Sequence, residues 1–305
     1  MAHYWLCPLY SFSSDIDTVS LTEGIQIIRI PAKFVEYLAE TFGHSLKTIP
    51  SRANWVVLIP YRIAASNGVN REALIAKLFR EHDRATNLLV DFISVLRLYK
   101  KGRVVAGLLT SAELQEAKWT IGGDTVWTPV SSIDFFEEDP IYEFRQVDVP
   151  EVNDLMSNIC KWREAKVLDK IHIALERFHS GYHGPIEDRL IYQVIAFESL
   201  YLHNDQELTY KLALRIAFLL GKRRDKRKTI LSDIKQAYNY RSRIVHGDNP
   251  PKRVTLKPAI AKTEDYLRHS IKTFLQLLAQ GKSLREIQEN LLDENILKDG
   301  KLLTL

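Results

Sequence analysis

Residues 238–247 read YNYRSRIVHG, and they close a run of apolar side chains that recur at the spacing of one helix face. At about 100° per residue, six apolar side chains fall within roughly 60° of Arg241. They are Ile230, Ile234, Ala237, Tyr238, Ile244 and Val245. Arg241 is therefore predicted at the centre of an apolar stripe, where a charge is unfavourable unless it is paired or used. Arg243 points to the opposite side and is predicted to be a solvated surface residue.

Helical periodicity extends outward from this segment and covers the chain from about Val152 onward. The predicted helices cover residues 154–179, 185–202, 207–220, 226–246 and 258–280, and glycines at 181, 221, 247 and 281 mark helix ends. Pro185 is typical of a first helical position. Short connections between helices of this length predict an antiparallel bundle.

The front half of the chain has a different pattern. Two short β-branched runs, residues 25–30 and 55–59, are each followed by a proline and predict strands. Further elements are expected as a helix over 71–85 capped by Asn70, a helix over 87–98, a hairpin over 118–127 and an acidic, aromatic segment at 134–143. The expected fold class is α+β, with a mixed α+β domain over residues 1–150 and an all-α helical bundle over residues 151–305.

Composition restricts the classes of protein to which the chain can belong. The 305 residues are 46% hydrophobic and 26% charged, which is ordinary for a globular protein with two buried cores. No apolar run approaches the roughly 18 residues that cross a bilayer, and the first residues lack a signal-peptide pattern. Cys7 and Cys160 stand far apart, as in proteins of a reducing compartment. A cytoplasmic protein without a membrane segment is expected.

Charge is distributed unevenly along the chain. Residues 1–150 hold 15 basic and 18 acidic side chains of the 42 and 38 in the whole chain, so the front half carries −3 and the rest +7. A polyanion is therefore expected to bind mainly to the back half.

His246 lies in the last turn of its predicted helix, next to a glycine. The negative end of a helix dipole favours imidazolium, which would help a histidine to serve as an acid or base near neutral pH. The spacing by itself favours structural roles: His246 as a cap on the last carbonyl groups, and Arg241 as one half of a buried ion pair. An arginine and a histidine five residues apart occur often by accident, so a catalytic role needs further support.

Arg241, four intervening residues and His246 fit the motif of the HEPN ribonuclease family, an Arg followed by four to six residues and a His. The longer phrase YRSRIVHG over 240–247 resembles the Apea-like branch of that family. So do the upstream phrases FESL over 197–200 and ELTYKLALR over 207–215, in the expected order and helical context. The resemblance covers roughly residues 165–281 and leaves the front half unexplained.

This resemblance implies a metal-independent endoribonuclease whose site forms at a homodimer interface, where two motif helices face each other. His246 would act on the 2′-hydroxyl or the leaving oxygen, and Arg241 would stabilise the charged phosphorane. Both residue types suit these roles, because imidazole exchanges a proton near pH 7 and a guanidinium binds phosphate oxygens bidentately. Ser242, after the motif arginine, matches a position that the family often fills with a polar side chain. Family members of this branch resemble toxins and antiviral defence effectors, in which a second domain senses or restrains the nuclease.

Two other functions remain open at this stage. Branches of the family have lost catalysis and bind RNA, a nucleotide or a protein partner instead, so a non-catalytic module is the main alternative. A plain dimerisation bundle, with the function in the front domain, is another. A regulatory ligand or protein bound by the front domain is a further expectation, motivated by the charge asymmetry.

Glu198 also lies at the centre of an apolar stripe, and with Tyr238 it is a candidate supporting residue. Its carboxylate must find a cation if it is buried. One interpretation is that it orients Arg241, and the other is that it pairs with Arg215 on a neighbouring helix.

A basic run lies between two of the predicted helices. It contains Lys222, Arg223, Arg224, Lys226, Arg227 and Lys228, with Asp225 as the only acidic residue. Such a run is often simply solvated, but beside an RNA-cutting site it is expected to contact RNA. His172, His179 and His183 have no cysteine or carboxylate to complete a ligand set, so no metal is expected. No cofactor fingerprint is present.

Overall fold

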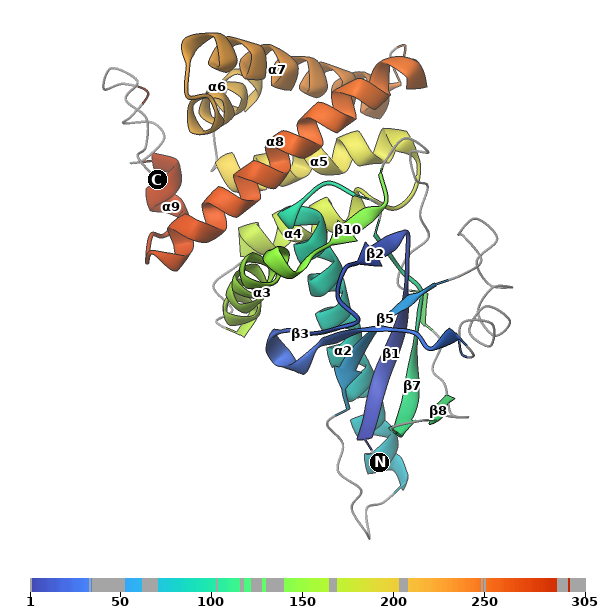
Figure 1. The fold of residues 1–305 in the computed structure, drawn as a ribbon. Helices are drawn as coiled ribbons and strands as arrows, with labels where there is room; N and C mark the ends of the chain where they lie inside the picture. Colours follow the sequence, from blue (N-terminus) through green and yellow to red (C-terminus); the bar gives the residue numbers. More distant parts are fainter. Residues whose placement is uncertain are drawn as a thin grey trace. The chain divides into compact units, whose positions relative to one another are not determined.

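The computed structural model describes residues 2–32, 34, 53–61, 71–102, 104–115, 118–121, 128–129, 140–164, 169–202, 208–247, 249, 251–289 and 296. The chain forms two compact units, Met1–Ser157 and Asn158–Leu305. A strand-rich unit with one long helix is followed by a unit of helices, which is the order of an α+β chain (Figure 1). The boundary between these units lies inside helix α3 (Val149–Glu164).

Strand β1 (Ala2–Tyr10) lies in the middle of the sheet of the first unit, between β5 (Trp55–Pro60) and β7 (Leu108–Gln115). Both pairings are antiparallel. Strands β3 (Thr18–Ser20), β4 (Gln26–Arg29) and β8 (Lys118–Ile121) complete the order β3-β4-β5-β1-β7-β8, while β6 (Val105–Ala106) pairs with β1 and β9 (Thr128–Pro129) with β7.

Both faces of the central strands are buried. Alternate residues of a strand point to opposite faces, and the indole of Trp5 meets the ring of His82 on helix α2 (Arg71–Tyr99) edge-on, with 5.3 Å between ring centroids. Leu6, on the other face, is buried in a cluster with Val56 and Leu58. Burial on both sides explains why β5 is a continuous apolar run without alternation.

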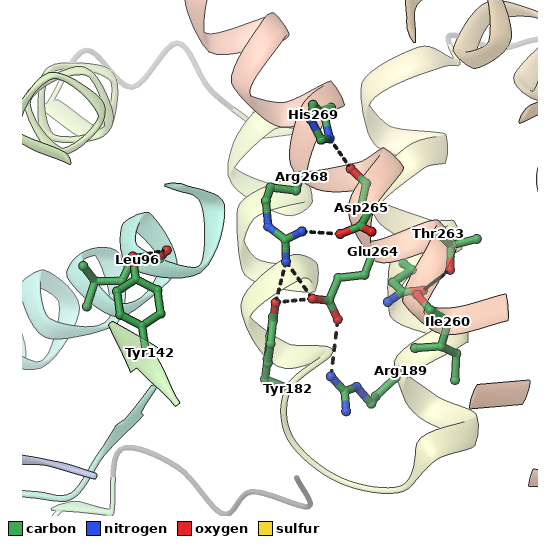
Figure 2. A network of polar contacts seen from close by, with 11 residues as sticks. Leu96, Tyr142, Tyr182, Arg189, Ile260, Thr263, Glu264, Asp265, Arg268 and His269 are labelled. Atoms are coloured by element: carbon green, nitrogen blue, oxygen red, sulfur yellow. Dashed lines mark hydrogen bonds and ion pairs between the residues drawn. The ribbon is translucent and has the colours of Figure 1, made fainter. Parts of the chain in front are cut away.

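A second, two-stranded sheet joins β2 (Phe12–Ser14) and β10 (Tyr142–Phe144) in parallel, and the Tyr142 hydroxyl donates to the Leu96 carbonyl at 2.8 Å (Figure 2). Asp148 follows β10 and accepts hydrogen bonds from the Tyr99 hydroxyl, the Lys100 ammonium and the Arg145 N–H. Burial by itself raises the pKa of this carboxyl, but the three donors hold it below its ordinary value. These contacts fix the start of α3.

The second unit is helical. Its helices are the end of α3, α4 (Asp169–Ser180), α5 (Ile186–Tyr201), α6 (Leu208–Leu220), α7 (Arg224–His246), α8 (Arg253–Ala279) and the short α9 (Leu284–Glu286). Helices α6 and α7 run antiparallel, because Phe218 meets Arg227 while Tyr210 meets Lys235. Helices α7 and α8 are also antiparallel, and Figure 1 shows all three side by side.

The strands at 25–30 and 55–59 and the helices at 185–202, 207–220 and 226–246 are confirmed within a few residues. Four predicted helices are wrong in extent. Those at 71–85 and 87–98 form the single helix α2, and 154–179 comprises α3 and α4. The helix predicted at 258–280 is α8, which begins at Arg253 and has Pro258 inside it. Strands β1 and β7 were not predicted. Asn70, residues 125–127 and most of the acidic segment at 134–143 lie outside the described residues.

No helix in the described part of the chain is long and apolar enough to cross a membrane.

A buried polar network fixes α5 against α8 (Figure 2). The Glu264 carboxylate accepts hydrogen bonds from the Tyr182 hydroxyl at 2.6 Å and from Arg268 at 2.8 Å, and it also meets Arg189 at 3.4 Å. Both arginines are at most 5% exposed, and Arg268 also binds Asp265 at 2.6 Å. Burial disfavours the charge of Arg268, yet these neighbours raise its pKa. One carboxylate thus compensates much of the charge of two buried guanidinium groups.

Replacing Glu264 by Gln should lower the free energy of unfolding by about 3 kcal/mol, because two buried arginines lose their shared counter-charge. Asp265→Asn is the matched control: the Asp265 side chain is 51% exposed, and its loss should cost less than about 1 kcal/mol. Urea denaturation of the two variants measures the difference. Equal effects would contradict the role assigned to Glu264.

Candidate active site on helix α7

Helix α7 has a buried face over most of its length and an uncovered face at its C-terminal end. Its buried side chains are Ile230, Ile234, Ala237 and Tyr240. C-terminal to them the apolar stripe continues, but neighbouring residues no longer bury it fully. Ile244 is half-buried, and Val245 is 51% exposed. The helix ends at Gly247, whose φ of 74° is the left-handed conformation that glycine adopts readily, as predicted.

Arg241 lies where the covered part of this stripe ends. Its side chain is half-buried, and its Nε atom is buried without a hydrogen-bond partner among the described residues. The guanidinium carbon lies 5.8 Å from the centre of the Tyr238 ring, within the range of a cation–π interaction. The prediction that Arg241 occupies the stripe agrees with this half-buried position.

Tyr238 connects Arg241 with Glu198 of α5. Its hydroxyl donates to the Glu198 carboxylate and accepts from the Thr209 hydroxyl of α6. Burial raises the pKa of Tyr238 above its ordinary value, the negative charge of Glu198 raises it further, and Arg241 opposes this shift. Three helices thus contribute to one polar cluster around the motif arginine.

This arrangement bears on the two interpretations of Glu198, as the residue that orients Arg241 or as the partner of Arg215. No ion pair joins Glu198 directly to Arg241 or to Arg215 in the part of the chain that the structure describes. Arg215 is buried and donates to the Tyr201 carbonyl. Glu198 instead acts through the Tyr238 hydroxyl. Sequence reasoning missed Thr209, which lies in the quoted phrase at 207–215 but carries no charge or stripe position that singles it out.

His246 is the last residue of α7 and is exposed. None of the described residues hydrogen bonds to its imidazole. It follows Arg241 by five residues, which places it about 140° around the helix and about 7.5 Å along its axis. The two motif side chains of one chain therefore leave the helix in different directions.

The two residues after the motif arginine are Ser242 and Arg243. Ser242 is half-buried. Arg243, predicted to be a solvated surface residue, is partly exposed, and its guanidinium also donates to the carbonyl of Asn249, just beyond the helix end. Asn249 has a positive φ of 50°, so this contact holds an unusual turn.

The predicted RNA-binding run lies at the corner between α6 and α7, and its cations fall into two kinds. Arg227 is half-buried, donates to the Gly221 carbonyl at 2.8 Å and stands 4.3 Å from the centre of the Phe218 ring. The other five, here called the basic corner, are exposed: Lys222, Arg223, Arg224, Lys226 and Lys228. Arg227 is thus a structural residue and not a free cation.

The basic corner and the motif pair occupy opposite ends of α7. At 1.5 Å per residue, between about 20 and 33 Å of helix separates the basic corner in the first turns from Arg241 and His246. The structure therefore does not bring the two sets of predicted site residues together within one chain.

A pocket of about 170 Å³ lies between α7 and α8, lined by Asp233, Gln236, Tyr240, Thr255, Pro258, Ala259 and Lys262. Arg241 does not line it. The ion pair between Lys262 and Asp233, at 2.9 Å, and the hydrogen bond from the Tyr266 hydroxyl to Asp233 connect its two walls.

Two of the three histidines considered above form a pair, His179 of α4 and His183 in the turn after it. The Nε2 atoms of His179 and His183 lie 3.1 Å apart. Among the described residues, no three His, Cys, Asp or Glu side chains gather as a metal site would require.

Comparison with models of known families, with curated proteins and with solved structures finds no match for this chain.

Arg227→Ala should lower the free energy of unfolding by about 1–2 kcal/mol, because it removes both the bond to Gly221 and the stacking on Phe218. Lys228→Ala, one residue further along, should change stability by no more than about 0.5 kcal/mol because Lys228 is exposed. Thermal and urea denaturation measure both. A Lys228 variant as unstable as the Arg227 variant would contradict this division of the run.

Proposed function

We propose that this protein is a metal-independent endoribonuclease of the HEPN type, acting as a homodimer with Arg241 and His246 as its catalytic residues. One observation carries the proposal. A half-buried arginine, braced through Tyr238 by Glu198, lies at the uncovered end of an apolar helix stripe, five residues before an exposed histidine at the helix terminus. The resemblance of residues 240–247 to the family motif supports the same reading.

The proposed reaction needs only a proton carrier and a cation. The imidazole of His246 takes the proton of a 2′-hydroxyl group, whose oxygen attacks the adjacent phosphorus, or gives a proton to the departing 5′-oxygen. The P–O5′ bond breaks as the P–O2′ bond forms, so one product ends in a 2′,3′-cyclic phosphate and the other in a 5′-hydroxyl. The guanidinium of Arg241 stabilises the charge on the phosphorane oxygens through paired N–H donors.

A second copy of the chain would allow an arginine and a histidine of the motif to reach the same phosphate. Arg241 and His246 diverge by about 140° around α7, so one helix cannot aim both at one phosphate directly. An isologous pair of α7 helices would bring the arginine of one copy toward the histidine of the other. It would also cover Val245 and the rest of the uncovered stripe.

Cleavage of total RNA in EDTA should be complete with the wild type and should fall by about 100- to 10,000-fold in His246→Ala, since a positioned acid or base is lost. Arg241→Lys keeps the charge but loses the bidentate fork, so a large loss is expected with the dimer intact. Mapping of product ends should find 2′,3′-cyclic phosphate or 3′-phosphate. Full activity of His246→Ala, or strict dependence on a divalent metal, would contradict the catalytic role proposed for His246 and Arg241.

Dimerisation can be tested separately from chemistry. Light scattering should give the mass of two chains, and Val245→Asp should shift the protein to the monomer and abolish cleavage without unfolding it, because Val245 is exposed in one chain. Val254→Asp, at a 75% exposed valine of α8, is the control and should leave the dimer and the activity unchanged. A wild type that stays monomeric at all concentrations with RNA present would count against the composite site.

A further experiment tests whether the arginine and the histidine of one site come from different chains. Co-expressed Arg241→Ala and His246→Ala chains form mixed dimers in which one arginine and one histidine remain, on different chains. Recovery of cleavage in the mixed dimer supports a site shared between chains. An inactive mixed dimer would place both residues of each site on one chain.

The second candidate function is a non-catalytic module that binds RNA, a nucleotide or a protein partner. It is favoured by one observation: no described residue orients the His246 imidazole. Host growth separates the two candidates. Growth arrest by the wild type that disappears in His246→Ala would support a nuclease toxin or defence effector, whereas unchanged growth arrest would favour the binding module.

A further inference from the structure

The basic corner carries charge that no described carboxylate compensates. None of Lys222, Arg223, Arg224, Lys226 and Lys228 forms an ion pair with a described residue, and Asp225 is the single acidic side chain among them. Lys226 alone has an aromatic contact, 5.9 Å from the Tyr266 ring centre. Two other cations at the surface of the same unit are paired: Lys282 with Glu286 and Arg285 with Glu289.

This charge is placed where the protein itself disfavours it. The cations repel one another, and they surround the first turn of α7, the positive end of its helix dipole. The first turn does hold one acidic residue, Asp225, but the five cations around it outnumber that single carboxylate. The arrangement becomes favourable when a polyanion binds, because its charge offsets both the mutual repulsion and the dipole.

The corner that presents these cations is rigid. A side chain at Gly221 would meet the Ala217 carbonyl oxygen at 2.6 Å, so the chain there admits only glycine without a shift. Arg227 closes the turn through the Gly221 carbonyl and the Phe218 ring. The exposed cations are therefore held at the end of a continuous helix, at a fixed distance from the motif pair.

That distance sets the size of the ligand. Helix α7 spaces the basic corner from Arg241 and His246 by about 20 to 33 Å. Successive phosphates of a stacked strand advance by about 3.4 Å, so about six to ten nucleotides lie between the two positions. A mononucleotide or dinucleotide cannot contact both.

We propose that the basic corner is a second contact for the RNA that the Arg241–His246 site cuts, so that the substrate class is RNA strands longer than about ten nucleotides. The inference rests on the proposed function for the identity of the cut strand. It adds that affinity for long RNA comes from the α6–α7 corner, whereas cleavage belongs to the opposite end of α7.

The test measures binding and cleavage separately with the full-length protein. Binding uses 2′-O-methyl RNA of about 4 and about 20 nucleotides, which lacks the 2′-hydroxyl needed for the proposed chemistry. Arg223→Gln/Arg224→Gln removes two unpaired cations of the corner. Lys282→Gln/Arg285→Gln removes two exposed cations whose charges are paired, and is the control matched in charge.

Wild-type protein and the control should bind the long RNA more tightly than the short one, with the same salt dependence. Each lost phosphate contact lowers the slope of log K against log salt by about 0.7 for a single strand, so the corner variant should lose about 1.4. Between about 50 and 200 mM salt, the wild type should then lose about sevenfold more affinity than the corner variant. On cleavable RNA, the corner variant should lose kcat/KM on long strands and match the wild type on short ones.

Failure of this inference and failure of the proposed function give different results. A corner variant with an unchanged salt slope and unchanged cleavage of long RNA overturns the inference and leaves the nuclease intact. A reduced slope with no cleavage by any form of the protein keeps the basic corner as an RNA contact but overturns the proposed function. Binding of the short and long RNA with equal affinity overturns the two-ended contact itself.

Discussion

The position of the candidate site depends on one buried carboxylate. Glu264 lies between two arginines that are almost completely buried, and their attraction fixes α5 against α8 at a defined register. Helix α8 in turn packs along α7, while α5 supplies Glu198 to the Tyr238 hydroxyl. An ion cluster of this kind adds less to stability than an apolar replacement could, because desolvation of the charges opposes their attraction. Its contribution here is to restrict how the helices pack.

Helix α7 combines two kinds of segment along one axis. Its first half is held by apolar burial at Ile230 and Ile234 and by the hydrogen bond from Arg227 to the Gly221 carbonyl before the helix. Its last turns are less buried, and the candidate catalytic side chains, Arg241 and His246, lie there. A rigid support beside a less constrained end is a common arrangement for sites that must be completed by something else. Tyr238 lies at the transition, with its ring toward Arg241 and its hydroxyl toward Glu198.

The sequence predicted α5, α6 and α7 within a few residues, because each has a clear apolar period, and α6 and α7 are each followed by a glycine. It failed for β1, since a strand buried on both faces shows no alternation and resembles any short apolar run. It also failed for β7, whose sequence LLTSAELQ contains a single β-branched residue. It also split α2, because Thr86 and Asn87 suggest a break that packing overrides. At the site, charge and stripe position located Arg241, Glu198 and Tyr238. The roles of Thr209 and Arg227 depend on which residues of other segments lie beside them in space. Hydrophobic periodicity within one sequence does not reveal such contacts.

The exposed end of the α7 stripe has a consequence for control in the cell. If a second copy completes the site, the number of working sites rises with the square of the chain concentration well below the dimer dissociation constant. A nuclease built in this way is nearly silent when newly made chains are scarce and becomes active steeply as they accumulate. Dilution alone would then act as an inhibitor, before any ligand or partner takes part.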